Sequence, residues 1–153
     1  MTNIFAHRGL SSKAPENTFA AFDLARKVEG VKWLELDVAI TKDEVLIIFH
    51  DDDLDRTTNT YGEVSETRYE AIQNASAGAW FHPEFADERI LTFEQLIAFA
   101  NRYKMNLNIE LKGVTGPNGT YLSERMLQLM KTQIEKLDDS VEVLISVSYT
   151  HLR

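Results

Sequence analysis

The segment that decides the fold class is Lys32-Trp33-Leu34-Glu35-Leu36-Asp37-Val38, whose side chains fall into two alternating sets. Successive side chains of a β-strand point to opposite faces. One face of this segment therefore carries Leu34, Leu36 and Val38, whereas the other carries Trp33, Glu35 and Asp37. Their i, i+2 spacing places the two carboxylates side by side near the carboxyl end of a predicted strand.

Short apolar segments on either side of residues 32–38 predict four more strands, at residues 4–6, 45–49, 107–111 and 141–147. Helical patterns lie between most of them: after the N-cap pair Asn17-Thr18, after the capping box Thr92-Phe93-Glu94-Gln95, and at residues 122–137. The continuous apolar run at 45–49 predicts a strand covered on both faces. This order predicts a parallel sheet with right-handed crossovers. A doubly wound sheet and a β/α-barrel both fit.

The polar residues at the strand ends separate these two folds. The first four predicted strands end in ionisable residues: His7-Arg8, then Glu35 and Asp37, then His50-Asp51, then Glu110 and Lys112. In a β/α-barrel the carboxyl ends of all strands meet on one active-site face. A doubly wound sheet instead concentrates its site at one switch point. The sequence therefore predicts an α/β fold of the (β/α)8 TIM-barrel type.

Three carboxylates, those of Glu35, Asp37 and Glu110, are expected together at the mouth of this barrel. Carboxylates held close together repel one another and require protons or a cation. A ligand set made only of oxygen favours Mg²⁺ or Ca²⁺ over zinc. The alternative is that these carboxylates form salt bridges with Lys112, Arg8 or Lys32.

His7 and His50 flank the carboxylates and are candidates for acid–base catalysis. Cleavage of a phosphodiester needs a base for the attacking hydroxyl and an acid for the departing oxygen, and two imidazoles can perform both tasks near neutral pH. A single histidine at a strand end is more often structural. Arg8 can bind two phosphate oxygens, and Lys112 supplies a point charge, unless both only neutralise the carboxylates.

Composition excludes several classes of function. The chain has 153 residues, of which 44% are hydrophobic and 26% charged, as in a globular domain. Its net charge of −8 argues against nucleic-acid binding, and it contains no cysteine. No apolar run approaches the ~20 residues of a membrane helix, and no signal-peptide pattern is visible. We therefore expect a cytoplasmic protein without stable membrane insertion.

The polar residues resemble the signature of the glycerophosphodiester phosphodiesterase family. The matching segments are His7-Arg8-Gly9, Glu16-Asn17-Thr18, Glu35-Leu36-Asp37-Val38, Thr41-Lys42-Asp43, His50-Asp51, Leu54, Arg56-Thr57-Thr58 and Glu110-Leu111-Lys112. One such tripeptide is weak evidence, but the series extends through most of the chain.

The resemblance implies hydrolysis of a small-molecule glycerophosphodiester to glycerol 3-phosphate and an alcohol, on a barrel with a bound divalent cation. It implies a substrate-covering insertion at residues 51–91. The roles it implies are metal ligands for Glu35, Asp37 and Glu110, the acid–base pair for His7 and His50, and phosphate contacts for Arg8 and Lys112.

The length of the chain differs from that of a full barrel, which has eight strands and typically ~250 residues. We expect residues 1–153 to form a single domain, an incomplete barrel of about five strands whose carboxyl-terminal part is missing. Residues 147–153 fit the family poorly. The first and fifth strands would be unpaired edges, so we expect oligomerisation through them.

Two rival functions stay open from the sequence. A phospholipase D-like lyase acting on lysophospholipids would use the same barrel site, and lipid-dependent activity would favour it. A truncated, non-catalytic fragment acting as a binding module would show no turnover with any divalent cation.

Overall fold

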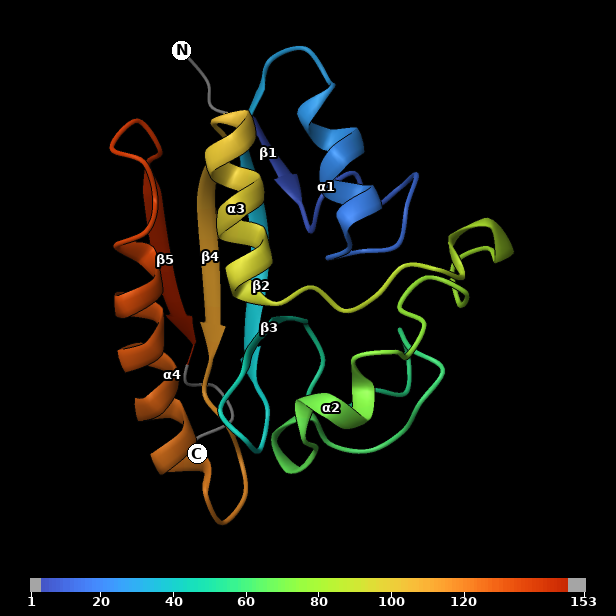
Figure 1. Ribbon diagram of the computed structural model, residues 1–153, viewed down its shortest axis with the longest axis vertical. Helices are drawn as coiled ribbons and strands as arrows, with labels where there is room; N and C mark the ends of the chain where they lie inside the picture. Colours follow the sequence, from blue (N-terminus) through green and yellow to red (C-terminus); the bar gives the residue numbers. More distant parts are fainter. Residues whose placement is uncertain (1–3, 149–153) are drawn as a thin grey trace.

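The computed structural model describes residues 4–148 (Figure 1). Of the segment 147–153 discussed above, residues 149–153 lie outside this range. The strands are β1 (Ile4–His7), β2 (Val31–Ile40), β3 (Leu46–Ile48), β4 (Asn106–Lys112) and β5 (Val143–Ser148). The α-helices are α1 (Phe19–Arg26), α2 (Tyr69–Ile72), α3 (Phe93–Tyr103) and α4 (Gly119–Ile134), and the short 3₁₀ helices are η1 (Val64–Glu66) and η2 (Pro83–Phe85).

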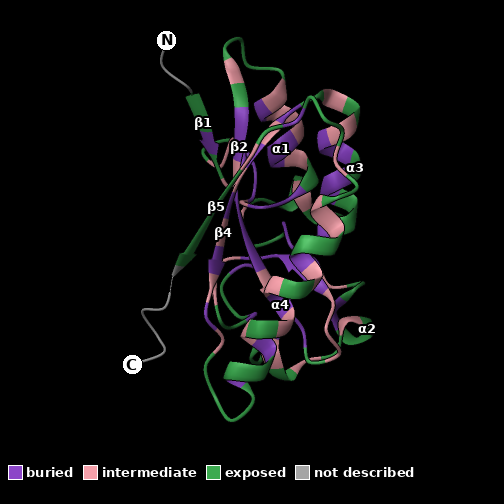
Figure 2. Ribbon diagram, turned by 90° about the vertical axis from the view of Figure 1, so that its left-hand side faces the viewer, coloured by how far each residue is buried: buried purple, intermediate pink, exposed green. Residues whose placement is uncertain are grey.

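The strands form one five-stranded sheet in the order β1-β2-β4-β5, with β3 attached to β2. The pairs β1–β2, β2–β4 and β4–β5 are all parallel, as the sequence predicts. Helices α1, α3 and α4 all lie on one side of the sheet (Figure 2). The register places Glu35 opposite His7 and Asp37 opposite Glu110. The polar face of β2 therefore continues across its two parallel neighbours.

The core fills the space between the sheet and these helices. Phe22 of α1, Phe93 and Leu96 of α3, and Leu36 and Leu107 of the sheet are all fully buried. Burying such a side chain contributes about 1.5–3 kcal/mol each. The predicted capping box at the start of α3 is confirmed, with both of its reciprocal hydrogen bonds present. The apolar faces of the helices thus fix the sheet and the strand ends.

The prediction of a parallel third strand at 45–49 is wrong. β3 runs antiparallel to β2, with Val38 opposite Ile48 and Ile40 opposite Leu46. The connection spans only residues 41–45, whereas a parallel crossover needs a dozen residues or more. The hairpin returns the chain to the level of Asp37, where the Phe49 amide donates to the Asp37 carbonyl over 2.9 Å. His50 therefore still reaches the level of the carboxylates.

Residues 51–91 form an insertion with a small core of its own. Leu54, Val64, Ile72 and Ile90 are buried there against Ile47 of β3. In Figure 1 this insertion lies beside the end of the sheet to which β2 and β4 point. It therefore brings polar side chains from a remote part of the sequence to the site.

The two edge strands expose apolar side chains. The exposed residues are Ile4 and Phe5 of β1 and Leu144, Ile145 and Val147 of β5. Within residues 4–148 no further strand pairs with either edge, so the sheet does not close into a barrel. None of the helices in the described part of the chain is long and apolar enough to cross a bilayer.

Candidate active site

The three predicted carboxylates do converge. Glu35 and Asp37 project from β2 and Glu110 projects from β4, and one oxygen of each lies within 4.8 Å of the others. The parallel register produces this cluster directly, since Asp37 and Glu110 are partners across β2 and β4. The side chain of Asp37 is only 2% exposed and that of Glu35 is 13% exposed.

The carboxylates of the cluster disfavour one another's ionised forms. Burial raises the pKa of the Glu35 carboxyl to about 7, and the neighbouring Asp37 carboxylate adds to this shift. Both effects disfavour the ionised form. The amide of Arg8 partly offsets them by donating to Oε2 of Glu35 over 3.2 Å.

A divalent cation fits these residues. Oδ1 of Asp37 is buried and, among the described residues, has no hydrogen-bond partner. A cation between the carboxylates would satisfy this oxygen and relieve the repulsion within the cluster. Because all the donors are carboxylate oxygens, the set matches Mg²⁺ or Ca²⁺.

Arg8, for which the resemblance implies a phosphate contact, is paired with two carboxylates. Its Nη1 donates to Oε2 of Glu16 over 3.1 Å, and its Nε forms an ion pair with Oδ2 of Asp37 at 3.3 Å. The salt-bridge alternative is thus realised for Asp37. Arg8 has a left-handed φ of 59°, and Gly9 follows with a φ of 84°. A Cβ at position 9 would lie 2.7 Å from the backbone of Ala21, so glycine permits this turn.

Asn17 contacts the carboxylate cluster, although the sequence pattern predicts for it only a place in the helix N-cap pair. Its side chain is buried, and Nδ2 donates to Oδ2 of Asp37 over 3.1 Å. Its own Oδ1 has no partner among the described residues, and its φ is 58°. The signal was present in the segment Glu16-Asn17-Thr18, which closely follows His7-Arg8. The hydrogen bond from Asn17 helps to hold Asp37 in place.

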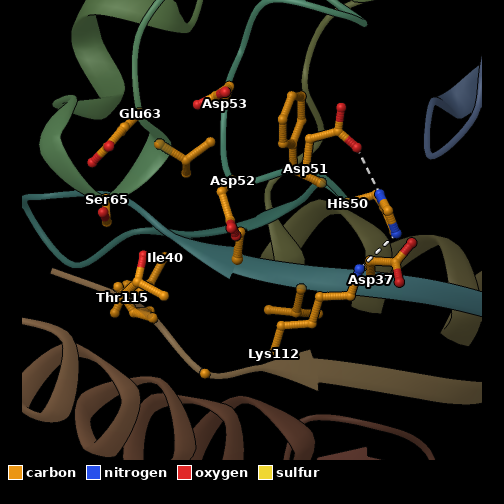
Figure 3. Close-up of a pocket in the computed structure, with 16 residues that line it drawn as sticks. Asp37, Ile40, His50, Asp51, Asp52, Asp53, Glu63, Ser65, Lys112 and Thr115 are labelled. Atoms are coloured by element: carbon orange, nitrogen blue, oxygen red, sulfur yellow. Dashed lines mark hydrogen bonds and ion pairs between the residues drawn. The ribbon is translucent and has the colours of Figure 1, made fainter. Parts of the chain in front are cut away.

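The two histidines lie in different surroundings. His7 is 67% exposed, and its Nε2 lies 3.5 Å from Oε2 of Glu35. His50 is enclosed between two charged groups: its Nδ1 lies 2.6 Å from Oδ1 of Asp51, and its Nε2 lies 2.6 Å from Nζ of Lys112 (Figure 3). An ammonium group can only donate. Nε2 of His50 is therefore the acceptor, and Nδ1 carries the ring proton.

Asp51 stays ionised over almost the whole pH range. The Arg56 guanidinium lowers the pKa of Asp51 to about 2, and the hydrogen bond to His50 contributes to the shift. Asp51 was expected only as a candidate site residue, and Arg56 only as part of a matching segment. The structure places both directly behind His50.

A cavity of about 260 Å³ adjoins this pair. Asp37, His50 and Lys112 line one part of it, while Asp52 and Glu63 belong to the insertion (Figure 3). The cavity thus joins a member of the carboxylate cluster to the His50–Lys112 pair. This arrangement can hold a cation, bind an anion, and accept or supply a proton.

Comparison with known protein families shows what the chain is similar to. The sequence profile described as "Glycerophosphoryl diester phosphodiesterase family" matches residues 7–150. The Bacillus subtilis protein YhdW is 46% identical over 127 residues, which are 83% of this chain and 51% of YhdW. A Bacillus altitudinis protein named glycerophosphodiester phosphodiesterase is 38% identical over 152 residues, 99% of this chain and 59% of that protein. The chain thus spans little more than half the length of these relatives.

The fold agrees with a solved structure as well. The structure of an Oleispira antarctica phosphodiesterase, in complex with the product sn-glycerol-3-phosphate, matches with a TM-score of 0.86 and 34% sequence identity. The match covers 96% of this chain and 57% of that one. The predicted barrel class is confirmed. The described residues contribute four parallel strands to such a barrel, namely β1, β2, β4 and β5.

Proposed function

The chain belongs to the glycerophosphoryl diester phosphodiesterase family, and from this premise we propose that it hydrolyses glycerophosphodiesters to glycerol 3-phosphate and an alcohol. One observation carries the proposal: a cavity lined by Asp37 of the carboxylate cluster is also lined by His50 and Lys112. The Oleispira relative holds glycerol 3-phosphate as its product, which supports the same substrate class here.

In this proposal Glu35, Asp37 and Glu110 hold Mg²⁺ or Ca²⁺. A bound divalent cation supplies positive charge that stabilises the developing charge on phosphate oxygens. Asp37 belongs to the carboxylate cluster and also lines the cavity, and a hydrogen bond from Asn17 holds its side chain, so a cation held by the cluster would lie near that cavity.

The protein's own residues perform the proton transfers. Hydrolysis forms a bond from a hydroxyl or water oxygen to phosphorus and breaks the bond from phosphorus to the alcohol oxygen. One proton leaves the attacking oxygen and one joins the departing alcohol. We assign these two transfers to Nε2 of His50 and to His7. The pairing of Nδ1 with Asp51 leaves the Nε2 lone pair of His50 directed toward Lys112 and the cavity.

Lys112 and Arg8 provide the phosphate contacts in this proposal. The ammonium group of Lys112 already lies at the cavity beside His50. Arg8 is held by Glu16 and Asp37, and a substrate phosphate would take over part of its donor capacity. We further propose that residues 1–153 belong to a single domain. We also propose a cytoplasmic location, which cell fractionation would test.

The test is release of glycerol 3-phosphate from glycerophosphocholine by the purified chain, with Mg²⁺, Ca²⁺ or EDTA. We expect cation-dependent turnover that is lost in Asp37→Asn and retained in Asp139→Asn, because Asp139 is exposed and distant in sequence from the cluster. Turnover that survives EDTA and Asp37→Asn would contradict the proposed site. Release of lysophospholipid-derived cyclic phosphate, with no activity on glycerophosphocholine, would support the lyase instead.

A further inference from the structure

We propose that Arg56 is a positioning residue, which clamps Asp51 and thereby holds His50 in the tautomer with the proton on Nδ1. The inference rests on the proposed function, because it assigns His50 a catalytic role. It adds to that function a residue from the insertion that touches neither the phosphate nor the cation.

The contacts of Arg56 use almost its entire donor set. Nε donates to Oδ2 of Asp51 over 2.8 Å, and Nη2 donates to Oδ1 of the same carboxylate over 2.9 Å. Nη1 and Nη2 also donate to the two oxygens of Glu16, each over 3.0 Å. A guanidinium has five N–H donors in a rigid planar arrangement, and Arg56 donates four hydrogen bonds to these two carboxylates. Arg56 thus has little capacity left for a substrate phosphate and acts through the two carboxylates.

The effect of this clamp on His50 follows from one shared oxygen. Oδ1 of Asp51 contacts both Nη2 of Arg56 and Nδ1 of His50. At neutral pH Asp51 is a carboxylate and only accepts hydrogen bonds, and the two hydrogen bonds from Arg56 fix the direction in which Oδ1 faces the ring. Nδ1 of His50 must then be the donor, and Nε2 is left unprotonated. A carboxylate fixed on two sides cannot rotate away and release the ring.

The other arm of the clamp connects the insertion to the loop after β1. Glu16 is only 11% exposed and lies 40 residues before Arg56. Oε2 of Glu16 also accepts from Nη1 of Arg8. The chain of contacts Arg8–Glu16–Arg56–Asp51–His50 is therefore continuous, and it links the loop after β1 to His50. Trp80 adds a partial cover, with its ring centroid 5.9 Å from the guanidinium carbon of Arg56.

Lysine at position 56 would supply the charge without the fork. An ammonium group is a point charge and cannot donate in parallel to two carboxylates with the same geometry. Arg56→Lys is therefore the informative conservative variant, and Arg56→Gln removes the charge as well. Arg68→Gln is the matched control, because Arg68 lies in the same insertion but only contacts the exposed Glu70, at 3.4 Å.

The experiment is ¹⁵N NMR of histidine-labelled protein, which distinguishes protonated from unprotonated ring nitrogens, with kinetics on glycerophosphocholine measured on the same samples. The wild type and Arg68→Gln should show His50 with the proton on Nδ1. In Arg56→Gln the Asp51 carboxylate is free to rotate and the His50 ring can turn away from Lys112, so we expect a mixture of tautomers. The fall in kcat should be about 10- to 100-fold, less than the roughly 10²- to 10⁴-fold that a positioned base contributes in full. KM should change little, and Arg56→Lys should lie between the two.

An unchanged His50 spectrum in folded Arg56→Gln would overturn the proposal. If that variant fails to fold, Arg56→Lys decides on the same readout. Failure of both to fold would also overturn it, because Arg56 would then act on stability. A wild type that shows the Nδ1–H tautomer and its loss in Arg56→Gln, but no turnover, would refute the proposed function while upholding the clamp.

Discussion

Nζ of Lys112 lies 2.6 Å from Nε2 of His50, although 62 positions separate the two residues in the sequence. The parallel strand β4 delivers the lysine, whereas the antiparallel return of β3 delivers the histidine. The contact keeps Nε2 unprotonated, since an ammonium group must donate to it. The lysine thus contacts the same nitrogen through which, in the proposed reaction, His50 exchanges a proton with the substrate.

Lys112→Met tests the role of this ammonium group. The substitution retains much of the side-chain volume but removes a charged donor that contributes about 1.5–3 kcal/mol to a hydrogen bond. We predict a loss of kcat/KM of roughly 10- to 150-fold at neutral pH. Steady-state kinetics would measure it, with Lys131→Met on the exposed side of α4 as the control. Equal kinetics in the two variants would remove Lys112 from the site.

Cation binding makes a second prediction, which does not depend on turnover. A ligand that binds only the folded state at 100 times its Kd stabilises that state by about 2.7 kcal/mol. Saturating Mg²⁺ or Ca²⁺ should therefore raise the Tm of the wild type, and EDTA should reverse the increase. Asp37→Asn should abolish the response, because Asp37 is the buried member of the cluster. Scanning calorimetry with Asp139→Asn as the matched variant would check this, and a cation response in Asp37→Asn would assign the cation elsewhere.

The sequence could predict the carboxylate cluster because strand alternation determines which side chains share a face. Glu35, Asp37 and Glu110 required only correct strands and a parallel register, and both were correct. The direction of β3 was not predictable from its apolar run, since such a run has no direction. The length of the 41–45 connection was the available evidence, and it excluded a parallel crossover.

The Arg56 clamp lay beyond sequence reasoning for a different reason. Its partners Asp51 and Glu16 come from separate loops, and nothing in the local pattern specifies which carboxylates an exposed arginine will contact. Backbone geometry adds to this difficulty. Arg8 and Asn17 in the loop after β1 both adopt the left-handed region, which asparagine enters several-fold more often than most residues but which the sequence does not predict for arginine.

Acid titration of stability tests the pairing of Asp51. Its pKa is about 2 in the folded protein against an ordinary value of 3.8. A lowered folded-state pKa stabilises the protein above the unfolded value, and the contribution is lost as the pH falls through the folded one. We predict that Asp51→Asn costs about 2 kcal/mol at neutral pH, with the difference shrinking below about pH 4. Urea unfolding from pH 7 to pH 2.5 would measure it. A difference that stays constant over this range would attribute the loss to something other than the ionised pair.

The open edges of the sheet lead to the last prediction. β1 and β5 present unpaired backbone groups together with exposed apolar side chains, among them Ile145, which is 47% exposed. Such edges pair readily with other strands, and an added charge on an edge suppresses this pairing. We expect the chain to self-associate in a concentration-dependent manner, and Ile145→Lys to shift it toward the monomer. Val28→Lys places the same charge on a residue of similar exposure, 41%, outside the strands, and should not change association. Light scattering coupled to size exclusion measures both, with circular dichroism to establish folding. A wild type that stays monomeric at all concentrations, or an Ile145→Lys variant that associates as the wild type does, would show that these edges are not the contact.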